Sequence, residues 1–222
     1  PWGNVLGTGV QLVTGVGGSP NIQYTFPTVA GVTLKAAMAP DMGSADVSDK
    51  GVSGNASGGT TGRGYDVTMN INPSFGTEIL SGLNIFAGAS QIENYVESAT
   101  ISNNRYEGIG GVTLDIGPIS VGYATSGIST GLSQSTSQVD WYKNHMFGIA
   151  FNINDDLSVS YGDHESRVGH THPDANGENN DLNIESWQIA YTMGGASVRL
   201  ADTEVSNAAY QTGAAYDKDA KI

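Results

Sequence analysis

Apolar and polar residues alternate along many short segments of this chain, and a period of two restricts the folds that it can adopt. Residues 65–71 read Tyr-Asp-Val-Thr-Met-Asn-Ile, with an apolar side chain at every second position. Successive side chains of a β-strand point to opposite faces, so such a segment predicts a strand with one apolar face. The pattern predicts an all-β fold of ten strands and no helix, at residues 22–26, 32–38, 65–71, 83–89, 112–116, 119–123, 147–153, 157–161, 187–193 and 198–200.

The connections between these segments are of two kinds. Short turns contain Gly, Pro, Asn or Asp, and they alternate along the chain with long polar links. This asymmetry is typical of outer-membrane β-barrels, but a soluble β-sandwich uses the same alternation to bury its core. The turns lie at residues 27–31, 73–81, 117–118, 154–156 and 194–195, and the links at 39–64, 91–105, 125–140, 163–183 and 202–216.

Composition excludes several classes of protein. The 222 residues include no Cys, which excludes disulfide scaffolds and Cys-ligated metal sites. The formal net charge of −13 argues against a nucleic-acid partner. No stretch approaches the 18 apolar residues of a transmembrane helix. A transmembrane barrel remains compatible with this composition because its lipid-facing and polar faces average out.

Aromatic residues favour the membrane alternative. Five of them lie where the predicted strands meet the long links, so all five would reach the same membrane–water interface. Outer-membrane barrels carry a girdle of aromatic residues at that level. The five are Tyr65, Tyr106, Tyr123, Tyr161 and Trp187.

Three segments resemble the general diffusion porins of alphaproteobacteria, most closely the marine, Pelagibacter-like type: residues 19–34, 151–161 and 187–202. The resemblance implies an antiparallel transmembrane β-barrel of about 16 strands, which assembles as a homotrimer in the cell outer membrane. This chain would be one barrel domain over residues 1–222, matching the middle and C-terminal two-thirds of such a porin. Residues 1–18 would be the tail of the loop that narrows the pore, and about 19–217 the strands, turns and external loops. The family's closing strand would begin where this chain stops, at Lys221 and Ile222.

If the apolar faces meet lipid, the opposite side chains line a water-filled channel. Six charged or ionisable residues on those faces are the pore-lining candidates: Lys35, Asp66, Glu107, Asp115, His164 and Arg199. Lys143, His145 and Glu185 share the parity of the apolar residues but lie near strand ends, which indicates positions at the rim.

One loop is rich in potential metal ligands. The sequence favours a solvated external loop, and any divalent cation bound there would use His170, His172 and Asp174. Neither a Gly-X-Ser-X-Gly nor a His-Glu-X-X-His motif is present, so no catalytic site is predicted.

The sequence thus predicts a porin that passes small hydrophilic solutes and ions by diffusion, with no enzymatic activity and no cofactor. Its expected partners are outer-membrane lipid, lipopolysaccharide and further copies of itself. The acidic excess predicts a preference for cations. Two alternatives stay open: a secreted or surface β-sandwich that binds or adheres, and a barrel that is an adhesin or a substrate-specific transporter.

Overall fold

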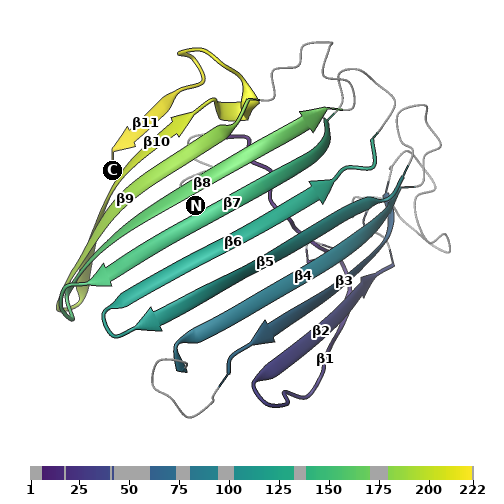
Figure 1. Cartoon of the computed structure of the whole chain (residues 1–222), viewed down its shortest axis with the longest axis horizontal. Coiled ribbons are helices and arrows are strands. Elements are labelled where there is room, and N and C mark those ends of the chain that lie inside the picture. The colour runs from purple at the N-terminus through teal and green to yellow at the C-terminus, as the bar shows by residue number, and fades with distance from the viewer. Residues whose placement is uncertain are drawn as a thin grey trace.

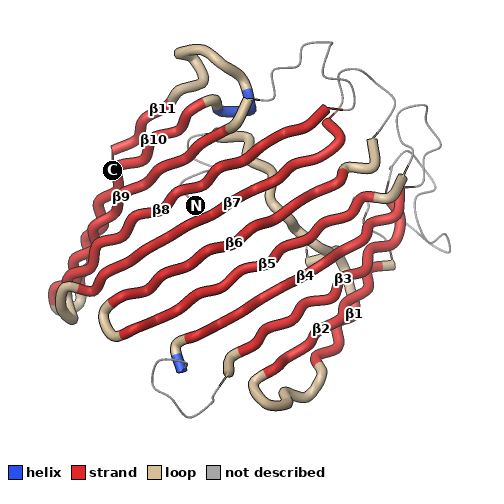
Figure 2. Tube along the Cα trace, in the orientation of Figure 1, coloured by secondary structure: helices blue, strands red, loops and turns tan. Residues whose placement is uncertain are grey.

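A computed structural model of the protein describes residues 7–17, 19–40, 42, 61–73, 81–94, 103–132, 139–170 and 180–221. Within these residues, eleven antiparallel strands form one sheet in which each strand pairs with the next along the chain (Figures 1 and 2). The strands are β1 (Ile22–Thr25), β2 (Val32–Ala39), β3 (Thr61–Ile71), β4 (Leu83–Asn94), β5 (Arg105–Ile116), β6 (Ile119–Ser129), β7 (Val139–Asn152), β8 (Leu157–His170), β9 (Leu182–Met193), β10 (Ala196–Ser206) and β11 (Lys218–Lys221).

The strands are longer, and one more numerous, than the sequence pattern predicts. β7 and β8 each have 14 residues, and β6, β8 and β10 extend into the segments that we expected to be long links. β11 was missed because Lys-Asp-Ala-Lys contains no apolar alternation; it forms by pairing with β10, where Asp202 lies opposite Lys221. Ladder hydrogen bonds therefore continue where the apolar pattern stops.

The predicted turns at residues 27–31, 117–118, 154–156 and 194–195 are found at those positions, while most of the turn at 73–81 lies outside the described residues. Gly117 and Gly194 adopt φ values of 55° and 59°, which lie in the left-handed region that glycine favours in tight hairpins. At the β7–β8 turn, the Asn154 side-chain oxygen accepts hydrogen bonds from the backbone N–H groups of Asp156 and Leu157, both at 2.9 Å. These contacts keep consecutive strands close at one end of the sheet.

A segment from the N-terminal region lies against one face of the sheet. This segment, residues 7–17, is called the strap below, and in Figure 1 it passes behind the strands. The face that it covers is called the inner face, and the opposite one the outer face. A short 3-10 turn, η1 (Ala208–Tyr210), follows β10 and contacts the strap: the Ala209 N–H donates to the Thr8 carbonyl at 2.7 Å. No helix in the described parts of the chain is long and apolar enough to cross a membrane.

Candidate functional site

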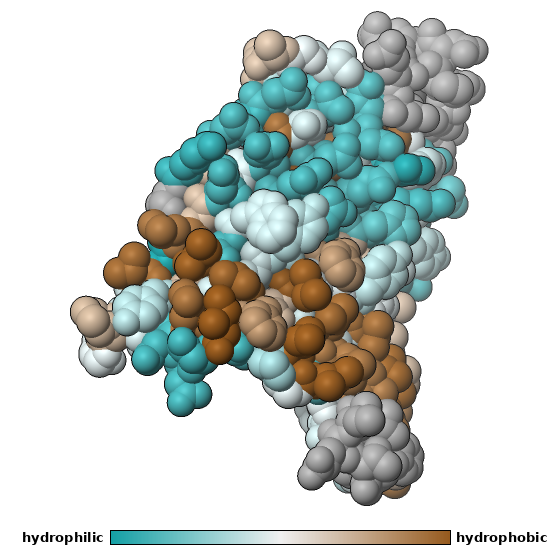
Figure 3. Space-filling model, turned by 60° about the vertical axis from the view of Figure 1, so that its left-hand side comes forward, coloured by the Kyte–Doolittle hydropathy of each residue, from teal (hydrophilic) through white to brown (hydrophobic). Residues whose placement is uncertain are grey.

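The outer face carries a continuous apolar band at the end of the sheet that holds the short turns. Strand register brings these side chains into line; for example, Val112 lies between Ile85 and Tyr123, and Val159 between Phe151 and Ile189. They are not packed into a core, since Val67 is 55% exposed and Ile189 46%. Figure 3 shows the band in brown, with a hydrophilic zone beyond it. A β-sandwich would bury this face, so the sandwich alternative does not fit the described strands.

The five predicted girdle residues mark the edge of the apolar band, and their line is inclined to the strands. The pairing row of Tyr65 crosses β5 at Tyr106, whereas the row of Trp187 crosses β5 at Leu114, eight residues further along. Eight residues of strand are about 27 Å long and the six spacings from β3 to β9 about 29 Å wide, which gives a slope of about 43°. Strands of outer-membrane barrels tilt by about 35–45°, so this line would lie level in a bilayer.

Beyond the aromatic line, the outer face becomes polar and charged. Lys143, His145 and Glu185 lie in this zone. They lie within β7 and β9 and not at strand ends, because the strands are longer than predicted; a position at the rim stays a prediction. Arg167 pairs with Glu165 at 2.5 Å and with Asp181 at 3.1 Å. This zone of charge is compatible with water or lipid headgroups and not with hydrocarbon.

All six predicted pore-lining residues lie on the inner face. The register shows this directly, because Asp66, Ser90 and Glu107 are consecutive partners in one row. Lys35, Asp115 and Arg199 are exposed, Asp66 and His164 are half-buried, and Glu107 is buried. The shared face agrees with the predicted positions, while the pore-lining role itself stays a prediction.

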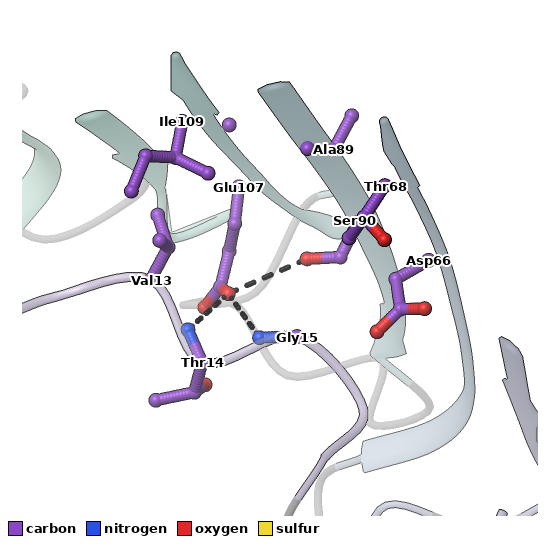
Figure 4. A pocket seen from close by; sticks show the side chains of 11 residues that line it. Val13, Thr14, Gly15, Asp66, Thr68, Ala89, Ser90, Glu107 and Ile109 are labelled. Carbon is purple, nitrogen blue, oxygen red and sulfur yellow. Dashed lines mark hydrogen bonds between the residues drawn. The ribbon is translucent and has the colours of Figure 1, made fainter. Parts of the chain in front are cut away.

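The Glu107 carboxylate lies beneath the strap and does not face open solvent (Figure 4). Its Oε2 atom accepts the backbone N–H groups of Thr14 at 2.8 Å and Gly15 at 2.9 Å, and the Ser90 hydroxyl at 3.3 Å. Its Oε1 atom is 2.6 Å from Nη2 of Arg105, and the side chain is 1% exposed. A cavity of about 160 Å³ lies beside this cluster, between the strap and the inner face of the sheet.

A second polar cluster holds the middle of the strap, and sequence reasoning missed it. Asn144 is fully buried, and its amide donates to the Gln11 carbonyl at 2.9 Å and to Ser126 Oγ at 3.1 Å. The Asn144 Oδ1 atom is 3.1 Å from Nε2 of His164. Asn144 lies on the polar parity of its strand, but nothing in the local sequence separates it from a solvated asparagine.

The described apolar core lies on the inner face, near the strap and η1, and not in the apolar band. Its larger members are fully or almost fully buried: Val16, Ile92, Ile128, Val168, Leu182 and Val205. Burial raises the pKa of the neighbouring Tyr210 hydroxyl, which hydrogen-bonds with Ser166 at 2.8 Å. Beyond the girdle the sheet therefore has the polarity of a soluble protein, apolar inside and polar outside.

The side chains of the three predicted metal ligands are not among those that the structure describes. His172 and Asp174 lie outside the described residues, and His170 ends β8 with a side chain that is not described. Among the residues that are described, no group of three or more His, Asp or Glu side chains could hold a metal ion. A cation in this loop stays a prediction.

Comparisons with known proteins support the fold. No family model and no curated protein matches the sequence. The outer membrane channel DcaP of Acinetobacter baumannii matches in structure with a TM-score of 0.61 at 9% identity, over 91% of this chain and 59% of that one. LpxR from Salmonella typhimurium aligns over 90% of this chain and 84% of its own, at 12% identity and a TM-score of 0.30, which is too low to support an argument.

At 9% identity, the likeness to DcaP shows the fold alone. This chain spans about three-fifths of that channel's length. Nothing in the comparisons supports the more specific resemblance to the porins of alphaproteobacteria. Over the described residues, the eleven-stranded antiparallel sheet has the β-barrel fold that this chain shares with DcaP.

Proposed function

We propose that this protein forms a water-filled channel in the outer membrane for passive diffusion of small hydrophilic solutes and ions. One observation carries the proposal: toward the short turns, the sheet has an apolar outer face edged by aromatic residues and a polar inner face. The strap crosses the inner face of the same sheet. A barrel built from such a sheet presents hydrocarbon-compatible side chains to lipid and encloses water. The strap would narrow that enclosed space.

The inner face near the short turns supports diffusion without tight binding. Hydroxyl and amide groups dominate there, and the few charges have both signs. Side chains of this kind replace part of a solute's hydration without holding it strongly. They include Thr113, Asp115, Ser120, Ser158, Ser160, Gln188 and Arg199.

The remaining expectations belong to this proposal. The apolar band fits outer-membrane lipid, and the charged zone beyond the aromatic line fits the headgroup level, where lipopolysaccharide would be the partner. A barrel also needs closed edges, because unpaired backbone groups are costly in hydrocarbon. The homotrimer, the diffusion-porin class and the absence of enzymatic activity rest on the family resemblance and on the absence of catalytic motifs.

Channel recordings and liposome swelling test the proposal. The full-length protein in a planar lipid bilayer should give stepwise, long-lived conductances that rise with KCl concentration. Swelling rates in uncharged sugars should fall smoothly with sugar size and should not saturate with concentration. Saturation for one solute would indicate a substrate-specific transporter, and intact barrels without conductance would exclude a diffusion channel.

A further inference from the structure

Hydrogen bonds fix the strap at both its ends and in the middle. At one end, the Thr8 carbonyl accepts the N–H of Ala209 in η1. In the middle, the Gln11 carbonyl accepts a hydrogen bond from Asn144 of β7. At the other end, Thr14, Gly15 and Val16 donate three successive N–H groups to carboxylates on β3 and β5. The strap thus connects the two flanks of the sheet across its inner face.

The carboxylate end of the strap is built from complementary shapes as well as hydrogen bonds. Gly15 has a φ of 57°, and a Cβ atom there would approach Asp66 Oδ2 to 2.8 Å. Val16 is almost fully buried and packs over Gly64 of β3, where a Cβ atom would come within 2.6 Å of Val16 Cγ1. The wall is therefore shaped to receive this part of the strap in one position.

Glu107 is the central contact of this end. A single oxygen, Oε2, accepts two adjacent strap N–H groups, and Arg105 compensates the charge from the other oxygen. Asp66 Oδ2 accepts the next N–H, that of Val16, at 3.1 Å. Hydrogen bonds to a charged acceptor are stronger than those between neutral groups. A buried carboxylate that accepts several backbone N–H groups therefore holds that backbone segment in place.

We propose that Glu107, assisted by Asp66, is the positioning residue that holds the strap against the wall of β3–β5 and so sets the clearance of the channel. This inference rests on the proposed function. It assigns Glu107 a different role from Asp115, which lies eight residues further along the same strand and face but is exposed and borders open space on the inner wall. Asp115 acts on ions by its charge, whereas Glu107 acts through the strap.

The first experiment follows the strap directly and does not depend on channel activity. Because the chain has no Cys, a nitroxide can be attached to a single Val13→Cys variant in the folded, lipid-embedded protein. The label should give an immobilised EPR spectrum in the parent and a mobile one after Glu107→Ala. Asp66→Asn should give a partial release, and the matched control Asp115→Asn should leave the spectrum unchanged.

Glu107→Gln is a second variant, which keeps the test informative if Glu107→Ala does not fold. An amide oxygen can still accept the two N–H groups but loses the charge and the Arg105 ion pair, so the label should be partly released. A label that stays immobile in both Glu107→Gln and a folded Glu107→Ala would overturn the proposal.

The second experiment separates positioning from charge. In planar bilayers, the double variant Glu107→Ala/Arg105→Gln, which removes both charges of the ion pair, should change the single-channel conductance and raise the open-channel current noise, with the reversal potential in a KCl gradient retained. Asp115→Asn should shift the reversal potential with the noise retained. A shifted reversal potential with unchanged conductance in this double variant would mean that the pair acts by its charge and not through the strap. If the parent forms no channel, the proposed function fails, while the Val13 label still decides whether Glu107 holds the strap.

Discussion

The two halves of the sheet, divided by the aromatic line, have opposite polarity. Toward the short turns, apolar residues such as Ile149 and Ile189 face outward and are exposed. Toward the long loops, apolar residues such as Leu182 and Val205 face inward and are buried, while the outer face carries charge. In the proposed barrel, one ladder of strands passes through two solvents, and the polarity of the side chains follows the solvent on each side. In that barrel, the same strand would be stabilised by lipid at one end and by a packed core at the other.

Removing core volume should have the largest effect. Leu182 is fully buried, so Leu182→Ala should cost about 2–5 kcal/mol of unfolding free energy through lost burial and a cavity. Leu200→Ala in the apolar band should cost about 1–2 kcal/mol, because lipid chains refill the space. Urea unfolding in lipid vesicles measures both. Equal costs would remove the distinction between the two halves.

A charge placed in the apolar band tests which face meets hydrocarbon. Ile149→Arg should cost about 2–4 kcal/mol, as arginine does near the middle of a bilayer. Thr113→Arg, on the inner face at a similar level, and His145→Arg, beyond the aromatic line, should cost far less. The same unfolding measurement applies. A high cost at Thr113 with a low one at Ile149 would reverse the assignment of faces.

The buried amide on the inner face gives a smaller effect. Asn144→Ala leaves the Gln11 carbonyl without its donor beneath the strap, and an unsatisfied buried group costs about 1–3 kcal/mol. Asn152→Ala is the matched control on the same strand and face, near the short turns where the residue is exposed; it should change stability by less than about 0.5 kcal/mol. If the two variants are alike in urea unfolding, Asn144 contributes no more than a solvated residue.

Ion preference should show the smallest effect. The acidic excess predicts a cation-selective reversal potential at low salt, and Asp115→Asn should reduce it while Arg199→Gln should increase it. Both shifts should shrink as KCl rises, since the screening length falls from about 10 Å at 0.1 M to about 3 Å at 1 M. Anion selectivity of the parent at low salt would contradict the prediction.

The sequence predicted the half of the sheet toward the short turns well and the half toward the long loops poorly. Strict alternation is found in the apolar band, so residues 65–71 and 147–153 were recognisable as strands whose apolar side chains share one face. Beyond the girdle, β8 continues through Asp163, Glu165 and Arg167 with polar side chains outward, and this reads as a polar loop. The ends of the strands were therefore wrong, although their number was short by only one.

The candidate site, like the fold, was predicted only in part from the sequence. Parity alone placed all six predicted pore-lining residues on one face, because in a strand the face follows from odd or even position. It could not separate Glu107 from Asp115, which share strand, face and charge. That difference arises from the strap, which is distant in sequence: Thr14, which donates to Glu107, lies 93 residues before it.

By itself, the sequence determined the all-β class, the positions of the short turns, the outward apolar band and its aromatic edge. These are local properties, set by the period of a strand and by the solvent that each face meets. Only the tertiary structure decided where the strands end, which apolar residues form the buried core, and which inner-face carboxylate is covered. Those features depend on ladder pairing and on the strap crossing the inner face. Contacts between distant segments leave no periodic signal in either segment.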